Sequence, residues 1–90
     1  MILVKPNVII IHVRDTVAIA LEDIQQGSSV HLPDGGSLRA QSDIPYSHKI
    51  ALKDLTQGED IIKYGEIIGQ AKQAIARGEW IHTHNLVVEE

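Results

Sequence analysis

The stretch ALEDIQQG at residues 20–27 decides the fold, because its spacing returns as ALKDLTQG at 51–58 and AKQAIARG at 71–78. Each copy has alanine, an aliphatic residue four positions later, and glycine three positions after that. We interpret each copy as a strand end, one tight helical turn, and a glycine of positive φ that begins the next strand. The aliphatic residue would plug the turn onto the core, while Asp23 and Asp54 would cap nearby backbone amides.

The segments between these turns predict short strands. Residues 8–13 and 17–21 form a predicted hairpin, and the turn at 33–36 joins predicted strands 30–32 and 37–39. Further extended segments are expected at 49–52, 59–62, 66–69 and 80–88. The one helical candidate, 69–77, is short. The pattern therefore predicts a mostly β, barrel-like fold of short strands with one or two short helical turns.

The composition predicts one small domain over residues 1–90 and argues against several classes of protein. The chain is 43% hydrophobic with one Trp, two Tyr and no Phe, so its core is aliphatic. A net charge of −4 with scattered Lys and Arg argues against nucleic acid as a partner. The lack of cysteine excludes a disulfide scaffold and a thiol nucleophile. No apolar run suits a membrane span or a signal peptide, so a cytoplasmic protein is expected.

Two histidines near the end of the chain are the first candidates for chemistry. If residues 80–88 are extended, His82 and His84 share one face, because side chains two apart in a strand point the same way. Imidazole is a common metal ligand and proton carrier near neutral pH. With Asn85 beside them, the pair could hold a divalent cation or an anionic substrate. On spacing alone, an exposed strand with two ordinary polar residues is the simpler interpretation.

Two other polar groups lie at predicted strand ends. His12 fits either a functional imidazole or one that is hydrogen-bonded to backbone. His48 and Lys49 follow the rigid Ile44-Pro45 segment and form either a solvated loop or a basic cluster aimed at a carboxylate. No phosphate loop, nucleophile elbow or Ser-His-Asp arrangement is present. The residues alone therefore indicate a small β module with a histidine-bearing rim that another chain would complete.

Several stretches in register resemble one family. They are SHKIALxDLxxG at 47–58, IKYGxxIG at 62–69 and GExIHxHN at 78–85, with an opening hairpin at 11–21. Together they resemble the N-terminal SAF-type domain of altronate dehydratase and galactarate dehydratase. The small subunit of sulfolactate sulfo-lyase is similar as well. The resemblance covers nearly the whole chain, and only residues 25–43 look variable.

The resemblance implies a β-clip (SAF-like) domain that serves a sugar-acid lyase. Because the chain ends soon after Asn85, the split form is expected, in which a small subunit works beside a large catalytic subunit. Altronate, or a related aldonic or aldaric acid, would lose water to give a 2-keto-3-deoxy acid. Fe²⁺ or Mn²⁺ would be held mainly by the large subunit. His82 and His84 would be catalytic residues or metal ligands, and the substrate-binding residues would be His12, His48, Lys49 and Asn85.

The sequence also departs from the family pattern. Glycine usually stands at the position of Ser47, so a positive φ there would strain the serine. Galactarate members lack the HxHN ending, which favours altronate or sulfolactate as the substrate. Sulfite elimination from sulfolactate is one alternative function. A non-catalytic carbohydrate-binding or assembly module is another, and a homo-oligomer is an expected state of the isolated chain.

Overall fold

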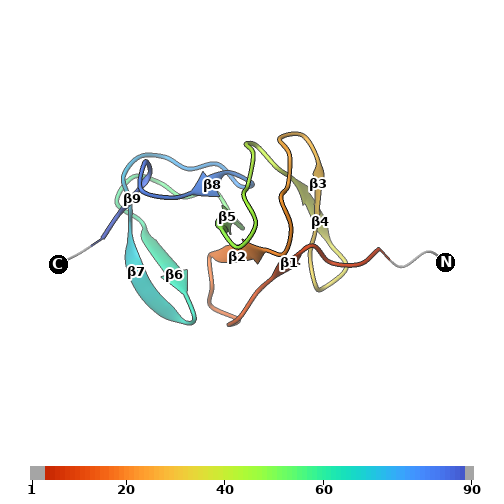
Figure 1. Ribbon diagram of the computed structural model, residues 1–90. Coiled ribbons are helices and arrows are strands. Elements are labelled where there is room, and N and C mark those ends of the chain that lie inside the picture. The colour runs from red at the N-terminus through yellow and green to blue at the C-terminus, as the bar shows by residue number, and fades with distance from the viewer. Residues whose placement is uncertain (1–3, 89–90) are drawn as a thin grey trace.

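The chain folds into short strands grouped in three small sheets (Figure 1). The computed structural model describes residues 4–88. No helix within that range is long and apolar enough to cross a membrane. The strands, in chain order, are β1 (Val8–Ile9), β2 (Val17–Ala20), β3 (Ser29–His31), β4 (Ser37–Arg39), β5 (Lys49–Ala51), β6 (Asp60–Lys63), β7 (Glu66–Ala71), β8 (Trp80–Ile81) and β9 (Leu86–Val87). The predicted mostly β fold class is confirmed.

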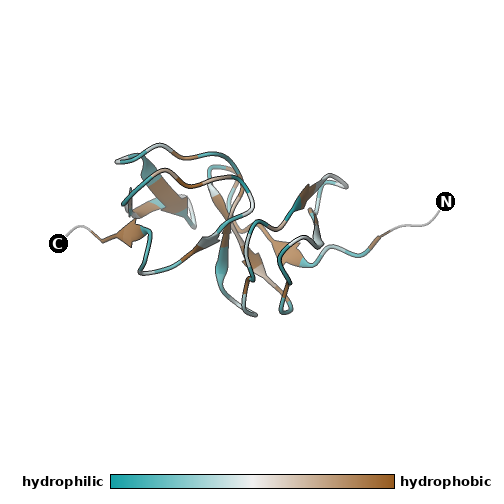
Figure 2. Ribbon diagram, turned by 90° about the horizontal axis from the view of Figure 1, so that it is seen from above, coloured by the Kyte–Doolittle hydropathy of each residue, from teal (hydrophilic) through white to brown (hydrophobic). Residues whose placement is uncertain are grey.

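The central sheet separates two cores. Its strand order is β1-β2-β5-β8, and all its neighbours are antiparallel. Successive side chains of a strand point to opposite faces, so Ile50 of β5 enters one core and Ala51 enters the other. The hairpin β3-β4 closes the first core, and the sheet β6-β7-β9 closes the second. Hydrophobic residues are more frequent in the strands than in the connecting loops (Figure 2).

Four corner turns, rather than three, organise the chain. We define them as residues 20–27, 40–47, 51–58 and 71–78. The additional copy runs from Ala40 through Ile44 to Ser47, and its last residue is serine with a φ of 65°. The glycines of the other three copies have φ between 84° and 93°. Ser47 therefore does have the positive φ that would strain a serine, and the missing glycine hides the pattern in this stretch of the sequence.

The corner turns associate in two pairs through the same backbone hydrogen bonds. Ile24 and Ile44 exchange two bonds of 2.9 and 2.7 Å, and Leu55 and Ile75 exchange two of 2.8 Å. All four of these aliphatic residues are buried, as the plug interpretation predicts. The residue at each glycine position also donates its backbone N–H to the carbonyl oxygen of the alanine that begins the paired turn. The N···O distance is 2.8 Å in every case. Backbone hydrogen bonds therefore join the two turns of each pair into one unit.

Aspartates cap the corner turns across each pair. Asp23 accepts from the backbone N–H of Tyr46 at 2.7 Å, and Asp43 accepts from that of Gln26 at 2.8 Å. In the second pair, Asp54 accepts from the N–H of Arg77 at 2.8 Å. The predicted capping roles of Asp23 and Asp54 are confirmed. Their partners lie in the opposite turn of the pair, which the local spacing did not reveal.

Three expectations about the elements are wrong. The first strand ends at Ile9 rather than residue 13, and Val13 is 95% exposed in the following loop. The helical candidate at 69–77 is instead the end of β7 followed by a corner turn, and residues 4–88 contain no helix. The extended segment 80–88 is broken by a turn at residues 82–85 between β8 and β9. Backbone hydrogen bonds between paired turns replace the expected helical ones.

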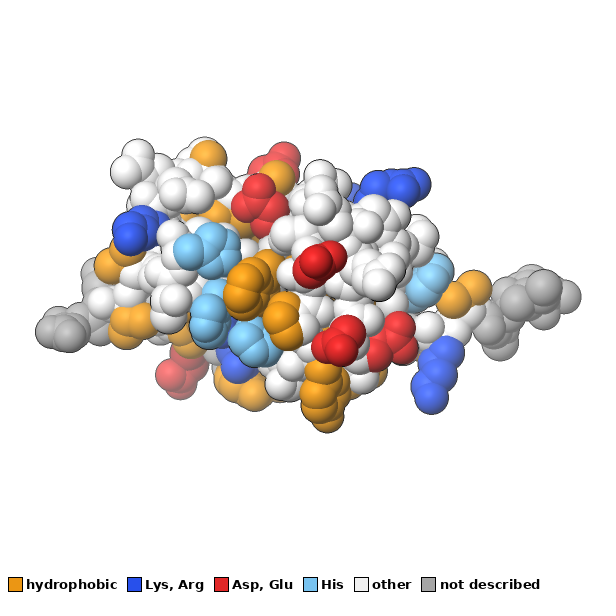
Figure 3. Space-filling view, turned by 45° about the horizontal axis from the view of Figure 1, so that its top comes forward, with side chains coloured by type: hydrophobic (Ala, Val, Ile, Leu, Met, Phe, Trp, Pro, Cys, Tyr) orange, Lys and Arg blue, Asp and Glu red, His pale blue; other side chains and the backbone are white. Residues whose placement is uncertain are grey.

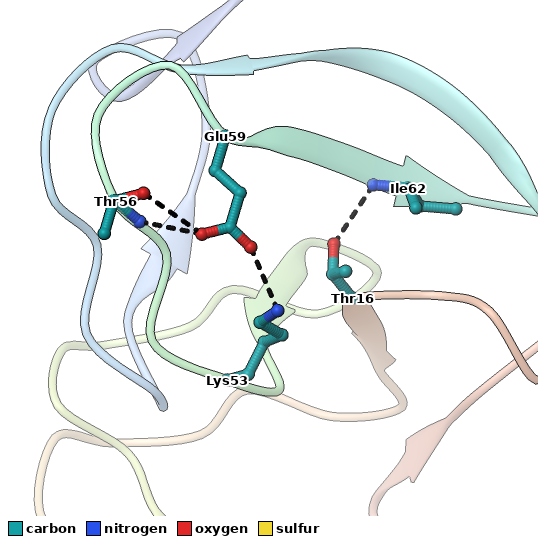
Figure 4. A network of polar contacts seen from close by, with 5 residues as sticks. All are labelled: Thr16, Lys53, Thr56, Glu59 and Ile62. Atoms are coloured by element: carbon teal, nitrogen blue, oxygen red, sulfur yellow. Dashed lines mark hydrogen bonds and ion pairs between the residues drawn. The ribbon is translucent and has the colours of Figure 1, made fainter.

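Polar side chains hold the second half of the molecule to the central sheet (Figure 4). The hydroxyl of Thr16 accepts from the backbone N–H of Ile62 at 3.0 Å, which joins the start of β2 to β6. Glu59 accepts from both the N–H and the hydroxyl of Thr56, at 3.1 and 3.2 Å, and pairs with Lys53 at 2.9 Å. The hydrogen bond from the Thr56 backbone, with the help of Lys53, lowers the pKa of Glu59 below its ordinary value.

Candidate functional site

Three imidazoles gather around the single indole of the chain. The ring of His82 stacks on Trp80, with centroids 5.2 Å apart and an interplanar angle of 8°. His48 lies 5.6 Å from Trp80 and 5.1 Å from His82, and His84 lies 5.2 Å from Trp80. We call these four residues the ring cluster. Histidine side chains gather beside hydrophobic surface on the face shown in Figure 3.

The pairing of β5 with β8 builds the ring cluster. Ile50 lies opposite Trp80, and Lys49 lies opposite Ile81. Extending this antiparallel register by one residue places His48 opposite His82. Each strand begins two residues after a corner turn ends, β5 at Lys49 after Ser47 and β8 at Trp80 after Gly78. The cluster is therefore positioned by backbone geometry on both sides.

Asn85 closes the turn that carries the last two histidines. Its side chain is 1% exposed, its carbonyl oxygen accepts from the N–H of His82 at 2.9 Å, and its amide donates to the carbonyl of Trp80 at 2.8 Å. The turn, rather than one face of a strand, brings His82 and His84 to the same indole. Because the carbonyl oxygen and the amino group of the Asn85 side chain both form hydrogen bonds to this segment, Asn85 stabilises the turn.

His48 is oriented by a hydrogen bond within the ring cluster. The indole Nε1–H of Trp80 donates to Nδ1 of His48 over 3.1 Å. The backbone N–H of Trp80 donates to the hydroxyl of Ser42 at 2.9 Å. Trp80 was given no role from the sequence, because a single tryptophan in a short strand resembles ordinary core. Its position on β8, opposite β5, is what identifies Trp80 as the residue that orients His48.

His12 belongs to a different part of the structure. Its Nδ1 accepts from the backbone N–H of Arg14 at 3.1 Å, and its ring lies against Gly65 in the β6–β7 turn. Asp15 accepts from the backbone N–H groups of His12 and Gly65, at 3.1 and 2.8 Å. Burial raises the pKa of Asp15, but the hydrogen bonds from the Gly65, Tyr64 and His12 backbone outweigh this and lower it. The described contacts of His12 join two loops and do not include the ring cluster.

Lys49 lies on the opposite face of β5 from His48. Its side chain is half-buried, and it begins β5 directly after His48, in extended backbone where successive side chains alternate. Burial, and secondarily the positive charge of Lys63, lower the pKa of Lys49 below its ordinary value. Neither lysine forms an ion pair with a described carboxylate. The expected basic pair is therefore divided between two surfaces.

The described residues do not form a metal site by themselves. Across residues 4–88, no group of three His, Cys, Asp or Glu side chains is arranged to hold a metal ion. Within the ring cluster, His82 is stacked on the indole and His48 lies tilted against both of these rings. His82 and His84 could therefore act as metal ligands only together with donors from another chain or domain.

The molecule is also hollowed at its other end. An open cavity of about 420 Å³ is lined by Asn7, Glu22, Asp23 and His31, among others. Two carboxylates at its wall disfavour an anionic sugar acid by charge repulsion.

The comparisons with known proteins define the family of this domain. The family model for the altronate/galactarate dehydratase SAF domain matches residues 6–89, so the chain belongs to the SAF domain family of these dehydratases. Among curated relatives, altronate dehydratase of Bacillus subtilis is 47% identical over 75 residues, which are 83% of this chain and 15% of the relative. Galactarate dehydratase (L-threo-forming) of Escherichia coli is 42% identical over 80 residues, 89% of this chain and 15% of the relative.

A shorter relative also matches. The alpha subunit of (2R)-sulfolactate sulfo-lyase from Paracoccus pantotrophus is 48% identical over 48 residues, which cover 53% of this chain and 72% of that subunit. The predicted resemblance to both groups is confirmed. The chain matches only about 15% of the length of the dehydratases. These relatives are lyases by name.

Proposed function

We propose that this chain is the small subunit of a sugar-acid lyase, which dehydrates altronate or a related aldonic or aldaric acid together with a separate large subunit. The observation that carries the proposal is the ring cluster, in which one strand pair of a dehydratase-family domain gathers three imidazoles and an indole on its surface. Imidazole N–H groups suit the carboxylate and hydroxyl oxygens of a polyhydroxy acid.

The reaction removes the proton on C2 of the acid and the hydroxide on C3, and the resulting enol becomes the 2-keto-3-deoxy acid. Negative charge builds on the carboxylate oxygens as the C2 proton leaves, and donors fixed near those oxygens stabilise it. In the proposal His82 and His84 contact the reacting part of the substrate, and His48 binds the carboxylate. The large subunit supplies the principal base and most ligands of a divalent metal such as Fe²⁺ or Mn²⁺.

The other predicted contacts take supporting places in this scheme. Lys49 and His12 lie away from the ring cluster, so we assign them to the surface that meets the large subunit or to the distal end of the substrate. Asn85 supports the site through the turn that it closes.

A reconstituted enzyme tests the proposal. The chain would be purified with a candidate large subunit from the same organism and assayed for 2-keto acid on altronate, galactarate and other sugar acids. We expect activity only when both chains are present, and a loss of roughly 10²-fold or more in kcat for His82→Ala and His84→Ala. His31→Ala, on the opposite end, is the matched control and should keep full activity. Full turnover by both ring-cluster variants would reject a catalytic role.

Sulfolactate is the second candidate substrate. It is favoured by the 48% identity to a sulfo-lyase subunit over 48 residues, which cover 72% of that subunit. Elimination of sulfite parallels loss of hydroxide, because both follow removal of a proton next to a carboxylate. Release of sulfite from (2R)-sulfolactate by the same reconstituted pair, with no keto acid from altronate, would select this alternative.

A further inference from the structure

We infer that Trp80 is a positioning residue that fixes His48 as a hydrogen-bond donor toward the substrate. The indole Nε1–H lies 3.1 Å from Nδ1 of His48. An indole nitrogen only donates, so Nδ1 must accept and carries no proton. A neutral imidazole whose Nδ1 is unprotonated holds its proton on Nε2. The tautomer follows from this contact alone, whereas the identity of the oxygen that it meets depends on the proposed function.

The surroundings keep the indole in place for this contact. The backbone N–H of Trp80 is bound by Ser42, and its carbonyl is bound by the buried amide of Asn85. One face of the indole is stacked on the ring of His82. A donor held on both sides of its backbone and over its ring face has little freedom to turn away. This arrangement preorganises the neighbouring imidazole before any ligand arrives.

The fixed tautomer separates His48 from the other two histidines of the ring cluster. To act as a base or a metal ligand through Nε2, neutral His48 would have to move its proton to Nδ1. That proton would then face the indole N–H, and the hydrogen bond would be lost. His48 is therefore suited to donate Nε2–H to a carboxylate or hydroxyl oxygen without any transfer of the proton. Among the described contacts, no equivalent hydrogen bond constrains the rings of His82 or His84.

Nitrogen-15 NMR of the full chain tests the tautomer directly. At about pH 8, above the ordinary histidine range, long-range proton–nitrogen spectra should show His48 with its proton on Nε2 alone. Trp80→Phe keeps an apolar ring but removes the donor, and His48 should become a mixture of tautomers. His12 is an internal control, because its Nδ1 accepts from the Arg14 backbone and its tautomer should not change. A proton on Nδ1 of His48, or no response to Trp80→Phe, would overturn the inference.

Two variants of His48 give a second readout that does not depend on Trp80→Phe folding. Glutamine places an amide donor near the position of Nε2, and asparagine places an acceptor near that of Nδ1. The chain has one tryptophan, so one indole N–H resonance reports the bond. His48→Asn should keep that resonance close to its native position, and His48→Gln should shift it. An unmoved indole resonance in both variants would also overturn the inference.

Kinetics of the reconstituted enzyme then tests the donor role. His48→Asn should lower kcat/KM for altronate roughly ten- to hundredfold, as expected for a lost hydrogen bond to a charged group, while His48→Gln, which keeps a donor, should lower it less. Equal losses in the two variants would reject the donor role. If the native pair turned over no sugar acid or sulfolactate, the proposed function would fail, while the NMR result on the tautomer would stand.

Discussion

The first pair of corner turns, 20–27 with 40–47, and the second pair, 51–58 with 71–78, share one backbone plan but differ in their side chains. The hydrogen bonds between paired turns repeat closely in the two halves. The first pair has serine at one glycine position and aspartate caps in both directions. The second pair has glycine at both positions and a single cap, from Asp54. The backbone plan therefore tolerates variation at these two positions.

The comparison also shows where the chain places its chemistry. The first turn of each pair leads into a hairpin, β3-β4 or β6-β7, that covers a core. The second turn of each pair leads into a strand of the central sheet, β5 after Ser47 and β8 after Gly78. Those two strands pair with each other. Trp80 lies in β8, while His48 and His82 directly adjoin the ends of β5 and β8. The equivalent exits of the two halves thus meet to form the candidate site.

Gly78 should be the most sensitive position in this plan. A Cβ atom there would overlap the backbone carbonyl oxygen of Arg39, whereas Gly27 and Gly58 face open space. Gly78→Ala combines an overlap with rigid backbone and a φ of 93°, so we expect a loss of about 3 kcal/mol or more in unfolding free energy. Urea denaturation followed by circular dichroism measures it.

Gly58→Ala is the matched control for this substitution. It has a similar φ of 84° and no neighbour within 4 Å, so the loss should be only about 1–2 kcal/mol. Equal losses at the two positions would show that φ alone decides, and that the close approach between the two halves is unimportant.

Much of the fold could be predicted, because the corner turns and hairpins are specified by residues that lie close together in the sequence. The spacing of alanine, plug and glycine fixed three corner turns, and the hairpin pairings followed from turn residues. The fourth turn was missed because Ser47 occupies the position of the glycine. The sequence pattern predicted one strand over residues 80–88. The turn that interrupts it depends on the hydrogen bonds of the buried Asn85 amide, which the pattern does not indicate.

The candidate site was predicted in part. His48, His82 and His84 were selected from the sequence and lie together in the structure. Trp80 was missed because its hydrogen bond joins residues 32 positions apart, a relation that only the pairing of β5 with β8 creates. The family resemblance implied His12 and Lys49 as part of the site, but loop contacts hold His12, and strand alternation holds Lys49, away from the ring cluster.

The single cap of the second pair gives a stabilising prediction. Ala74 occupies the position that Asp43 has in the first pair, where Asp43 accepts from the N–H of Gln26. Ala74→Asp should therefore bind the N–H of Gln57 and raise the unfolding free energy by about 1 kcal/mol. Ala74→Asn, which adds no charge, should give a similar gain. Asp43→Ala should cost about the same amount in the first half. If it does while both Ala74 variants are neutral, the two pairs are not equivalent.

Ser47→Gly should give the smallest effect, and it isolates the one strained corner. Relief of a positive φ favours glycine by about 1–2 kcal/mol, and the greater freedom of glycine in the unfolded chain offsets about 0.5–1 kcal/mol of that. We expect a net gain of about 0.5 kcal/mol. Ser28→Gly, at a residue outside the positive-φ region, should instead lose stability. Thermal melts of both variants measure these changes. A loss of stability in both would mean that Ser47 is not strained, and that serine suits this corner turn as well as glycine suits the other three.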